Sequence, residues 1–147
     1  MKLILFTAFF FLLLFSACRK DNSGSNDILG SWKLIQVFDK NTSTISYPPS
    51  SNMDVVITFL DRNSFAGHTL RNSLSDGAYT QNGNEIIFKT FAMTKINEDQ
   101  WGESFLTVLH ACSLQSVSPC APSVVTLQGN LMKIQTPLRY DITLKRI

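Results

Sequence analysis

The sequence predicts a mainly β domain of the α+β class, in which antiparallel strands pack on one helix. Short β-branched or alternating segments recur from residue 31 to residue 145, separated by Gly, Asn and Asp turns. The stretch 98–112 departs from this pattern and takes a helical period. The chain has 147 residues, and the part after its apolar start suffices for a single domain with one core.

The first half of the chain predicts a meander of strands. Residues 31–38 follow Gly30 and alternate imperfectly between apolar and polar, which predicts a strand with a bulge or twist. The polar stretch 41–52 has Pro-Pro near its end and predicts a long loop. We expect further strands at 54–60, 64–70, 78–80 and 85–91, with turns at 61–63, 76–77 and 81–84.

The second half predicts a helix followed by another meander. Apolar residues at spacings of four, four and three run from Trp101 to Cys112 and predict an amphipathic helix over 98–112. Asn97 is the expected N-cap of this helix. After a loop at 113–123, we expect strands at 124–127, 131–136 and 138–145. The last of these alternates cleanly, so one of its faces should be buried.

The N-terminus has the pattern of an export signal. Lys2 precedes an apolar run from residue 3 to residue 15 that is interrupted only by Thr7, and residues 1–17 are predicted to be a signal peptide. The segment Leu-Phe-Ser-Ala-Cys that ends at Cys18 resembles the bacterial lipobox. This resemblance implies a lipid on Cys18, which would anchor the mature protein to a membrane. The alternative is a soluble secreted protein in which Cys18 is an ordinary thiol.

Cys18 is followed by a polar segment. Residues 19–27 hold no apolar side chain, so residues 18–27 are predicted to form the lipidated cysteine and a flexible tether. An Asp directly after the lipidated cysteine resembles a signal for retention in the inner membrane. This chain has Arg19 at that position, which favours the bacterial outer membrane. Lys20-Asp21 loosely resembles a signal for display on the cell surface. The domain is therefore expected to face either the periplasm or the outside of the cell.

Residues 28–147 contain a series of short motifs in a fixed order: Leu29 to Leu34, Phe59 to Gly67, Gly77-Ala78-Tyr79, Met93-Thr94-Lys95, Glu103 to Leu109, and the terminal strands at Leu131 and Leu138 to Leu144. In this order they resemble the META domain, a family of small bacterial envelope proteins. The resemblance implies a half-barrel-like antiparallel sheet of about seven to eight strands wrapped on one helix, and no defined activity. Two positions depart from it: Gly67-His68-Thr69 and Ile96-Asn97 stand where the family often has cysteines.

A second resemblance points to a different function. Gly30-Ser31-Trp32 is similar to the G-x-W signature of the first lipocalin strand. This alternative implies a barrel that carries a small hydrophobic ligand in its interior. The residues expected to line such an interior are Trp32, Phe59, Phe88 and Tyr140.

Two cysteines remain once Cys18 is assigned to lipidation. Cys112 and Cys120 form an even pair in an exported protein, which predicts a structural disulfide. Free thiols and a redox pair are the alternatives, although the C-x-x-C spacing that favours redox work is missing.

We find no pattern that predicts catalysis, a metal site or a cofactor. His68 and His110 lack the spacing of metal ligands, and Asp99 with Glu103 is best explained by helix capping and solubility. A net charge of +2 with scattered basic residues argues against nucleic-acid binding. The sequence therefore predicts a non-enzymatic, lipid-anchored envelope protein that binds another envelope protein or contributes to stress tolerance, with the lipocalin-like carrier as the alternative.

Overall fold

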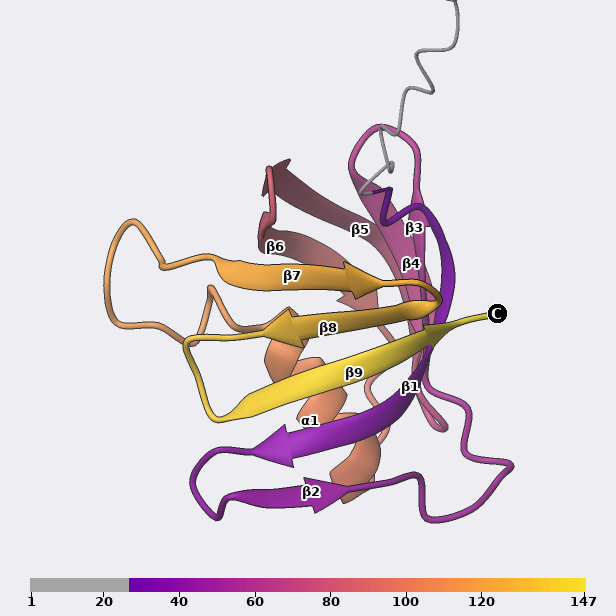
Figure 1. The fold of residues 1–147 in the computed structure, drawn as a ribbon. Helices are drawn as coiled ribbons and strands as arrows, with labels where there is room; N and C mark the ends of the chain where they lie inside the picture. Colours follow the sequence, from indigo (N-terminus) through magenta and orange to yellow (C-terminus); the bar gives the residue numbers. More distant parts are fainter. Residues whose placement is uncertain (1–26) are drawn as a thin grey trace, which may run out of the picture.

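The computed structural model describes residues 27–147, which form a β-barrel with one helix (Figure 1). The mainly β class predicted from the sequence is confirmed. The elements are β1 (Gly30–Asp39), β2 (Thr44–Ser46), β3 (Val56–Leu60), β4 (Ser64–His68), β5 (Ser73–Asn82), β6 (Glu85–Met93), α1 (Gln100–Leu109), β7 (Ser123–Gln128), β8 (Leu131–Gln135) and β9 (Tyr140–Arg146).

The barrel is closed by β1, so the half-barrel expected from the META resemblance is corrected to a closed one. Strands β1 and β3 to β9 are joined in antiparallel order, and β1 pairs with both β3 and β9. The register of β1 against β9 shifts between Leu34 and Gln36, which is the bulge expected in this strand. A bulge bends and twists a strand. This bend allows the first part of β1 to pair with β3 and its last part, from Val37 to Asp39, to pair with β2.

The seam between β6 and β7 is the narrowest in the barrel. Only two residue pairs join these strands, Glu85 with Val124 and Ile86 with Ser123. Helix α1 lies behind β9 and β1 in the view of Figure 1 and packs against these two strands. Its apolar side chains therefore fill interior space between the two curved parts of the sheet.

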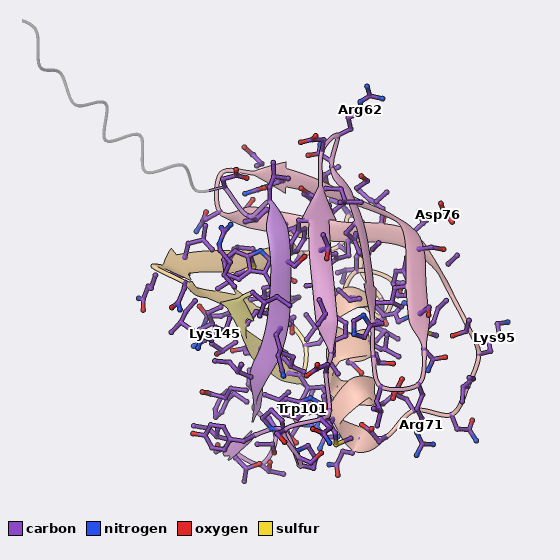
Figure 2. All side chains as sticks on the ribbon, turned by 90° about the vertical axis from the view of Figure 1, so that its right-hand side faces the viewer. Arg62, Arg71, Asp76, Lys95, Trp101 and Lys145 are labelled. Atoms are coloured by element: carbon purple, nitrogen blue, oxygen red, sulfur yellow. A yellow bond between two sulfur atoms is a disulfide. The ribbon has the colours of Figure 1, made fainter. Side chains whose placement is uncertain are left out.

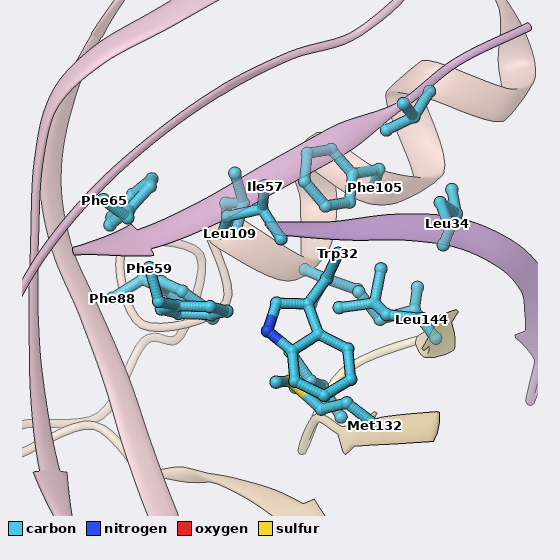
Figure 3. Packing of buried hydrophobic residues seen from close by; sticks show 14 of the residues in the cluster. Trp32, Leu34, Ile57, Phe59, Phe65, Phe88, Phe105, Leu109, Met132 and Leu144 are labelled. Carbon is cyan, nitrogen blue, oxygen red and sulfur yellow. The ribbon is translucent and has the colours of Figure 1, made fainter. Parts of the chain in front are cut away.

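The core is made of side chains from every long strand and from α1. Phe105 and Leu109 are directed from α1 toward the strands, where both are buried (Figure 3). Aromatic rings pack edge to face, with 5.3 Å between the ring centroids of Phe59 and Tyr79 and 5.5 Å between those of Phe65 and Phe88. The interior of the barrel is thus occupied by the protein's own side chains.

Two local expectations are corrected by the structure. The stretch 41–52 contains the short strand β2 and is not wholly a loop. Residues 76–77 form an irregularity within β5 rather than a turn, with Asp76 at φ 52°. Gly77 faces the ring of Phe65, and a Cβ atom at this position would lie 2.6 Å from that ring. The need for close approach to Phe65, rather than a chain reversal, explains the glycine.

The helix is shorter than expected and has a different cap. It runs from Gln100 to Leu109, and the N-cap is Asp99 rather than Asn97. An Asp99 carboxylate oxygen accepts a hydrogen bond of 2.8 Å from the backbone N–H of Gly102. The carbonyl of Asn97 instead accepts a hydrogen bond of 2.9 Å from Arg71. Asn97 therefore belongs to the loop that leads to the helix.

A buried asparagine fixes that loop. Asn72 is 2% exposed, and its amide nitrogen donates to the carbonyl of Ile96 at 2.8 Å and to a carboxylate oxygen of Glu98 at 2.7 Å. Its amide oxygen accepts from the N–H of Ile96 at 2.9 Å and from the hydroxyl of Thr94 at 3.1 Å. Thr69 also donates to Glu98. These bonds attach the β4–β5 turn to the segment that begins α1.

The turns lie at two opposite rims of the barrel. We call the end where residue 27 enters the entry rim; it comprises residues 27–29, the turns 61–63, 83–84 and 129–130, and Ile147. The other end is the groove rim, comprising residues 40–55, 69–72, 94–99 and 136–139. Figure 2 shows the two rims at opposite ends of the molecule, with Arg62 on the entry rim and Trp101 beside the groove rim.

Replacing Asn72 with Ala is expected to lower the free energy of unfolding by about 2–3 kcal/mol, because it removes the hydrogen bonds of the buried Asn72 amide to the backbone of Ile96 and to Glu98. Urea unfolding followed by circular dichroism measures this change. Asn52→Ala, which alters an exposed loop residue, is the control and should stay within about 0.5 kcal/mol of the wild type. Equal effects of the two substitutions would contradict the assigned role of Asn72.

Candidate functional site

The candidate site is a groove of about 380 Å³ at the groove rim. It lies between the end of β1, strand β2, the start of β9 and the first turns of α1. Its walls combine aromatic and other apolar side chains with short polar ones. The lining residues are Val37, Asp39, Thr44, Ser46, Tyr47, Pro49, Gln100, Trp101, Ser104 and Tyr140.

Strand register brings the sheet side of the groove together. Asp39 lies opposite Thr44 of β2 on one edge of β1 and opposite Tyr140 of β9 on the other edge. Val37 lies opposite Ser46. Because alternate residues of a strand share a face, positions 37 and 39 present their side chains to the same side of the sheet. The groove floor is therefore fixed by the end of the strand that closes the barrel.

Helix α1 supplies the opposite wall. Gln100 and Ser104 are four residues apart and so lie on one helix face, and the Ser104 hydroxyl donates to the Gln100 carbonyl at 2.8 Å. Trp101 is the adjacent wall residue. The Asp99 cap and the Asn72 network fix where this first turn begins. The position of the wall thus depends on polar contacts outside the groove.

A bidentate ion pair borders the groove. Arg139 donates to the Asp39 carboxylate from Nε at 3.0 Å and from a terminal nitrogen at 2.6 Å, and its guanidinium lies 4.8 Å from the ring centroid of Tyr140. Hydrogen bonding to Arg139 lowers the pKa of Asp39 from 3.8 to about 2. This carboxylate is ionised at neutral pH, so it cannot donate a proton there as a general acid.

A second ion pair lies on the same rim. Lys40 and Asp141 are 3.1 Å apart, and Asp141 is buried. The second oxygen acceptor for Lys40 is the carbonyl of Thr136. A carboxylate oxygen of Asp141 also accepts a hydrogen bond of 3.0 Å from the N–H of Thr136. These contacts hold the β8–β9 turn against the end of β1 and neutralise the charges beside the groove.

One polar atom in the groove wall lacks a partner. Trp101 is 5% exposed, and its indole Nε1 has no hydrogen-bond acceptor among residues 27–147. Most buried donors in proteins are satisfied. Tyr47, directly after β2, adds apolar surface across the groove and is 66% exposed. The groove therefore offers aromatic faces, and the wall residue Trp101 keeps a buried N–H without an acceptor in the described part of the chain.

The four residues predicted to line a carrier's interior do not share one site. Trp32, Phe59 and Phe88 are buried in the core cluster, whereas Tyr140 borders the groove. Trp32 donates from its indole nitrogen to the Ile28 carbonyl at 2.7 Å. Arg146 lies over its ring at 4.4 Å from the centroid. Trp32 thus belongs to the packing beneath the entry rim.

The structure joins Cys112 and Cys120 in a disulfide, with 5.3 Å between their Cα atoms. The side chain of Gln115 spans the loop that this bond closes. Its amide donates to the carbonyls of Ala111 at 2.9 Å and Ala121 at 3.0 Å, and it accepts from the N–H of Ala121 at 2.8 Å. Cys18, the predicted lipidation site, lies outside the described residues, as do the predicted signal peptide and residues 19–26 of the tether.

The remaining candidate residues are dispersed. Burial lowers the pKa of His110, whose ring centroid lies 4.7 Å from that of Phe91, and His68 is exposed at the end of β4. Asp99 caps α1, as expected for a residue near its start, and Glu103 is exposed. Within residues 27–147, no three His, Cys, Asp or Glu side chains are grouped as metal ligands, and no helix is long and apolar enough to cross a membrane.

Sequence reasoning missed the groove. Trp101 has the spacing of a core residue, and its burial agrees with that interpretation, yet it also forms the groove wall. Tyr47 lies in a stretch that was expected to be a loop. The available signal was an aromatic residue directly before Pro48-Pro49, which is a weak signal without the strand pairing that places it.

Comparisons with known proteins show what this fold is similar to. No protein-family profile matches the chain, and no curated protein matches it. A protein from Burkholderia xenovorans solved by NMR is similar over 80% of this chain and 81% of its own, with 18% identity and a TM-score of 0.57. A second NMR structure is 19% identical over 80% of this chain and 88% of its own, with a TM-score of 0.55.

A crystal structure of a DUF4847 family protein from Bacteroides vulgatus is also similar. It covers 79% of this chain and 91% of its own, at 12% identity and a TM-score of 0.55. These similarities concern the fold alone. The META and lipocalin resemblances stay predictions.

Replacing Arg139 with Ala is expected to return the pKa of Asp39 from about 2 toward 3.8. In the wild type, the ion pair contributes stability at pH values above 3.8, and this contribution is lost as the pH falls toward 2. A carboxyl-carbon NMR titration of Asp39 measures the shift. Arg71→Ala is the control because Arg71 contacts Asn97 instead. An unchanged Asp39 titration in Arg139→Ala would contradict this ion pair.

The paired substitution Cys112→Ser with Cys120→Ser is expected to lower the free energy of unfolding by about 2–3 kcal/mol, because the unfolded chain loses a short closed loop. Urea unfolding measures this difference. Alkylation of the unfolded wild-type protein, followed by mass spectrometry, provides an independent test. Neither residue should react before reduction, so modification of both thiols without reductant would contradict the disulfide.

Proposed function

We propose that this chain is a non-enzymatic, lipid-anchored protein of the bacterial outer membrane whose groove binds another envelope protein. One observation carries the binding part: aromatic side chains and the unpaired Trp101 donor lie beside a strand with an open edge. The anchoring part depends on the lipobox-like sequence that ends at Cys18.

Strand β2 favours a protein partner. It pairs with β1 on one side, and no strand within residues 27–147 pairs with its other edge. All three of its residues, Thr44 to Ser46, are exposed and none is charged. An open strand edge can pair with an extended segment of another protein, which then places alternate side chains in adjacent pockets. The groove is the adjacent pocket here.

The composition of the groove also suits a protein interface. Aromatic residues are enriched in such interfaces, and Tyr47, Trp101 and Tyr140 all line the groove. Asp39 and Asp141 are both paired with cations, so an approaching apolar segment meets little uncompensated charge.

The carrier alternative is supported by one observation, the size of the same groove. Its volume of about 380 Å³ falls in the usual range for small-molecule sites. Because Trp32, Phe59 and Phe88 are packed in the core, a bound molecule would occupy the groove beside Tyr140 rather than the barrel interior. Carriage would therefore involve only one of the four residues first assigned to it.

A photoreactive amino acid at position 47 is expected to form one discrete adduct with an envelope protein in living cells of the native host, because Tyr47 is exposed beside the groove. The same amino acid at position 133, on the outer face of β8, is the control. Trp101→Phe leaves a smaller aromatic ring in the groove wall and removes the N–H donor, and it should weaken the position-47 adduct. Adducts of equal yield from positions 47 and 133 would contradict the groove as the binding site.

Native mass spectrometry of protein extracted from the same cells separates the two candidate functions. A bound small hydrophobic molecule that is lost in Tyr140→Ala would favour the carrier. Protein that carries no such mass and still forms the position-47 adduct would favour the protein-binding function.

A further inference from the structure

The entry rim is held together by a stacked arginine. The guanidinium of Arg146 lies over the Trp32 ring and donates to the carbonyls of Asp27 and Leu29, at 3.0 Å in each case. The N–H of Ile147 donates to the Ser31 carbonyl at 3.0 Å. The point where the chain enters the barrel is therefore attached to the last strand, and it cannot move independently of the rim.

The chain length upstream of this point limits which rim can reach a membrane. If Cys18 carries the lipid, nine residues lead from it to Asp27, and they span at most about 32 Å when fully extended. Strand β1 has ten residues and extends about 33 Å from the entry rim toward the groove rim. The groove rim could meet the bilayer only if the upstream chain were stretched along the side of the barrel.

The side chains of the entry rim suit contact with lipid headgroups. Leu60 is 45% exposed and Ile147 is 67% exposed. Arg62 is at the tip of the β3–β4 turn and projects from the end of the molecule (Figure 2). Asp27 and Asp61 also lie on this rim, so the rim carries no net positive charge. Contact therefore depends on the short upstream chain and on the apolar tips more than on charge.

We propose that the entry rim faces the lipid bilayer, with Leu60 and Ile147 at the headgroup boundary and Arg62 near lipid phosphates. This inference rests on the proposed lipid anchor at Cys18. It directs the groove rim, with Tyr47 and Trp101, away from the bilayer that holds the protein. A partner would then approach the groove from the aqueous side.

The test uses the lipidated protein, labelled with nitrogen-15, in nanodiscs of phosphatidylethanolamine and phosphatidylglycerol. A fraction of the lipids carries a gadolinium chelate on the headgroup, which broadens the NMR signals of nearby amides. We expect the strongest broadening at the turns 61–63 and 83–84 and the weakest at β2. Uniform broadening, or the strongest broadening at β2, would overturn the proposed orientation.

Two matched leucines test the contact itself. Leu60 on the entry rim and Leu70 on the groove rim are 45% and 48% exposed. Leu60→Ser should reduce the broadening at residues 61–63 by about twofold relative to the wild type in the same nanodiscs, because the apolar contact of this turn with the bilayer is lost. Leu70→Ser should leave it unchanged. Equal effects of the two substitutions would overturn the assignment of Leu60 to the bilayer contact.

Failure of the anchor is recognised separately. The intact mass of the protein extracted from the nanodiscs reports whether Cys18 carries lipid, and Cys18→Ser should abolish retention on the discs. An unlipidated chain that still binds the discs equally well would contradict the proposed anchoring. A lipidated chain with uniform broadening would overturn the orientation alone.

Discussion

The structure depends on β1 pairing with strands from both halves of the chain. Its ten residues pair with β3 on one edge and with β9 on the other, and the bulge between Leu34 and Gln36 bends the strand enough to do both. Without the pairing of β1 with β9, the strands would form one open sheet, whose two meanders meet only at the β6–β7 seam. The same strand carries Trp32 beneath the entry rim and Asp39 at the groove. The length of β1 therefore sets the distance between the entry rim and the groove.

Polar contacts complete what strand pairing begins. Asn72 and Glu98 attach the β4–β5 turn to the start of α1, and the position of Trp101 follows from where that helix begins. On the opposite side of the groove, Arg139 holds Asp39 beside Tyr140. The groove is thus formed by elements from three distant parts of the sequence. Each of them is fixed by hydrogen bonds to charged or amide side chains rather than by apolar packing alone.

Much of the fold could be predicted from the sequence because its signals are local. The alternation of apolar and polar residues predicted β9, and the helical spacing of apolar residues from Trp101 predicted α1. The closure of the barrel could not be predicted, since it depends on pairing between β1 and β9, more than 100 residues apart. Asp76-Gly77 looked like a turn because the sequence does not reveal the Phe65 ring that requires the glycine.

The site was less accessible to sequence reasoning than the fold. Its residues are ordinary ones, and their significance arises from register: Thr44 and Tyr140 become neighbours only because both lie opposite Asp39. A cysteine pair can be interpreted from its count and compartment, whereas a groove between a three-residue strand and a helix leaves no such pattern. Cys18 shows the reverse case, a site suggested by sequence in a part of the chain that the structure does not describe.

The narrow seam between β6 and β7 has a consequence for how the barrel opens. Two residue pairs hold these strands, while β5 and β6 pair along most of their length. Local opening of a protein follows its least bonded boundaries. Thermal fluctuation should therefore unzip the barrel at this seam into a curled sheet before any other strand separates. Lys89, an exposed charge on β6, would then disfavour pairing of a strand from another protein with the free edge of β6.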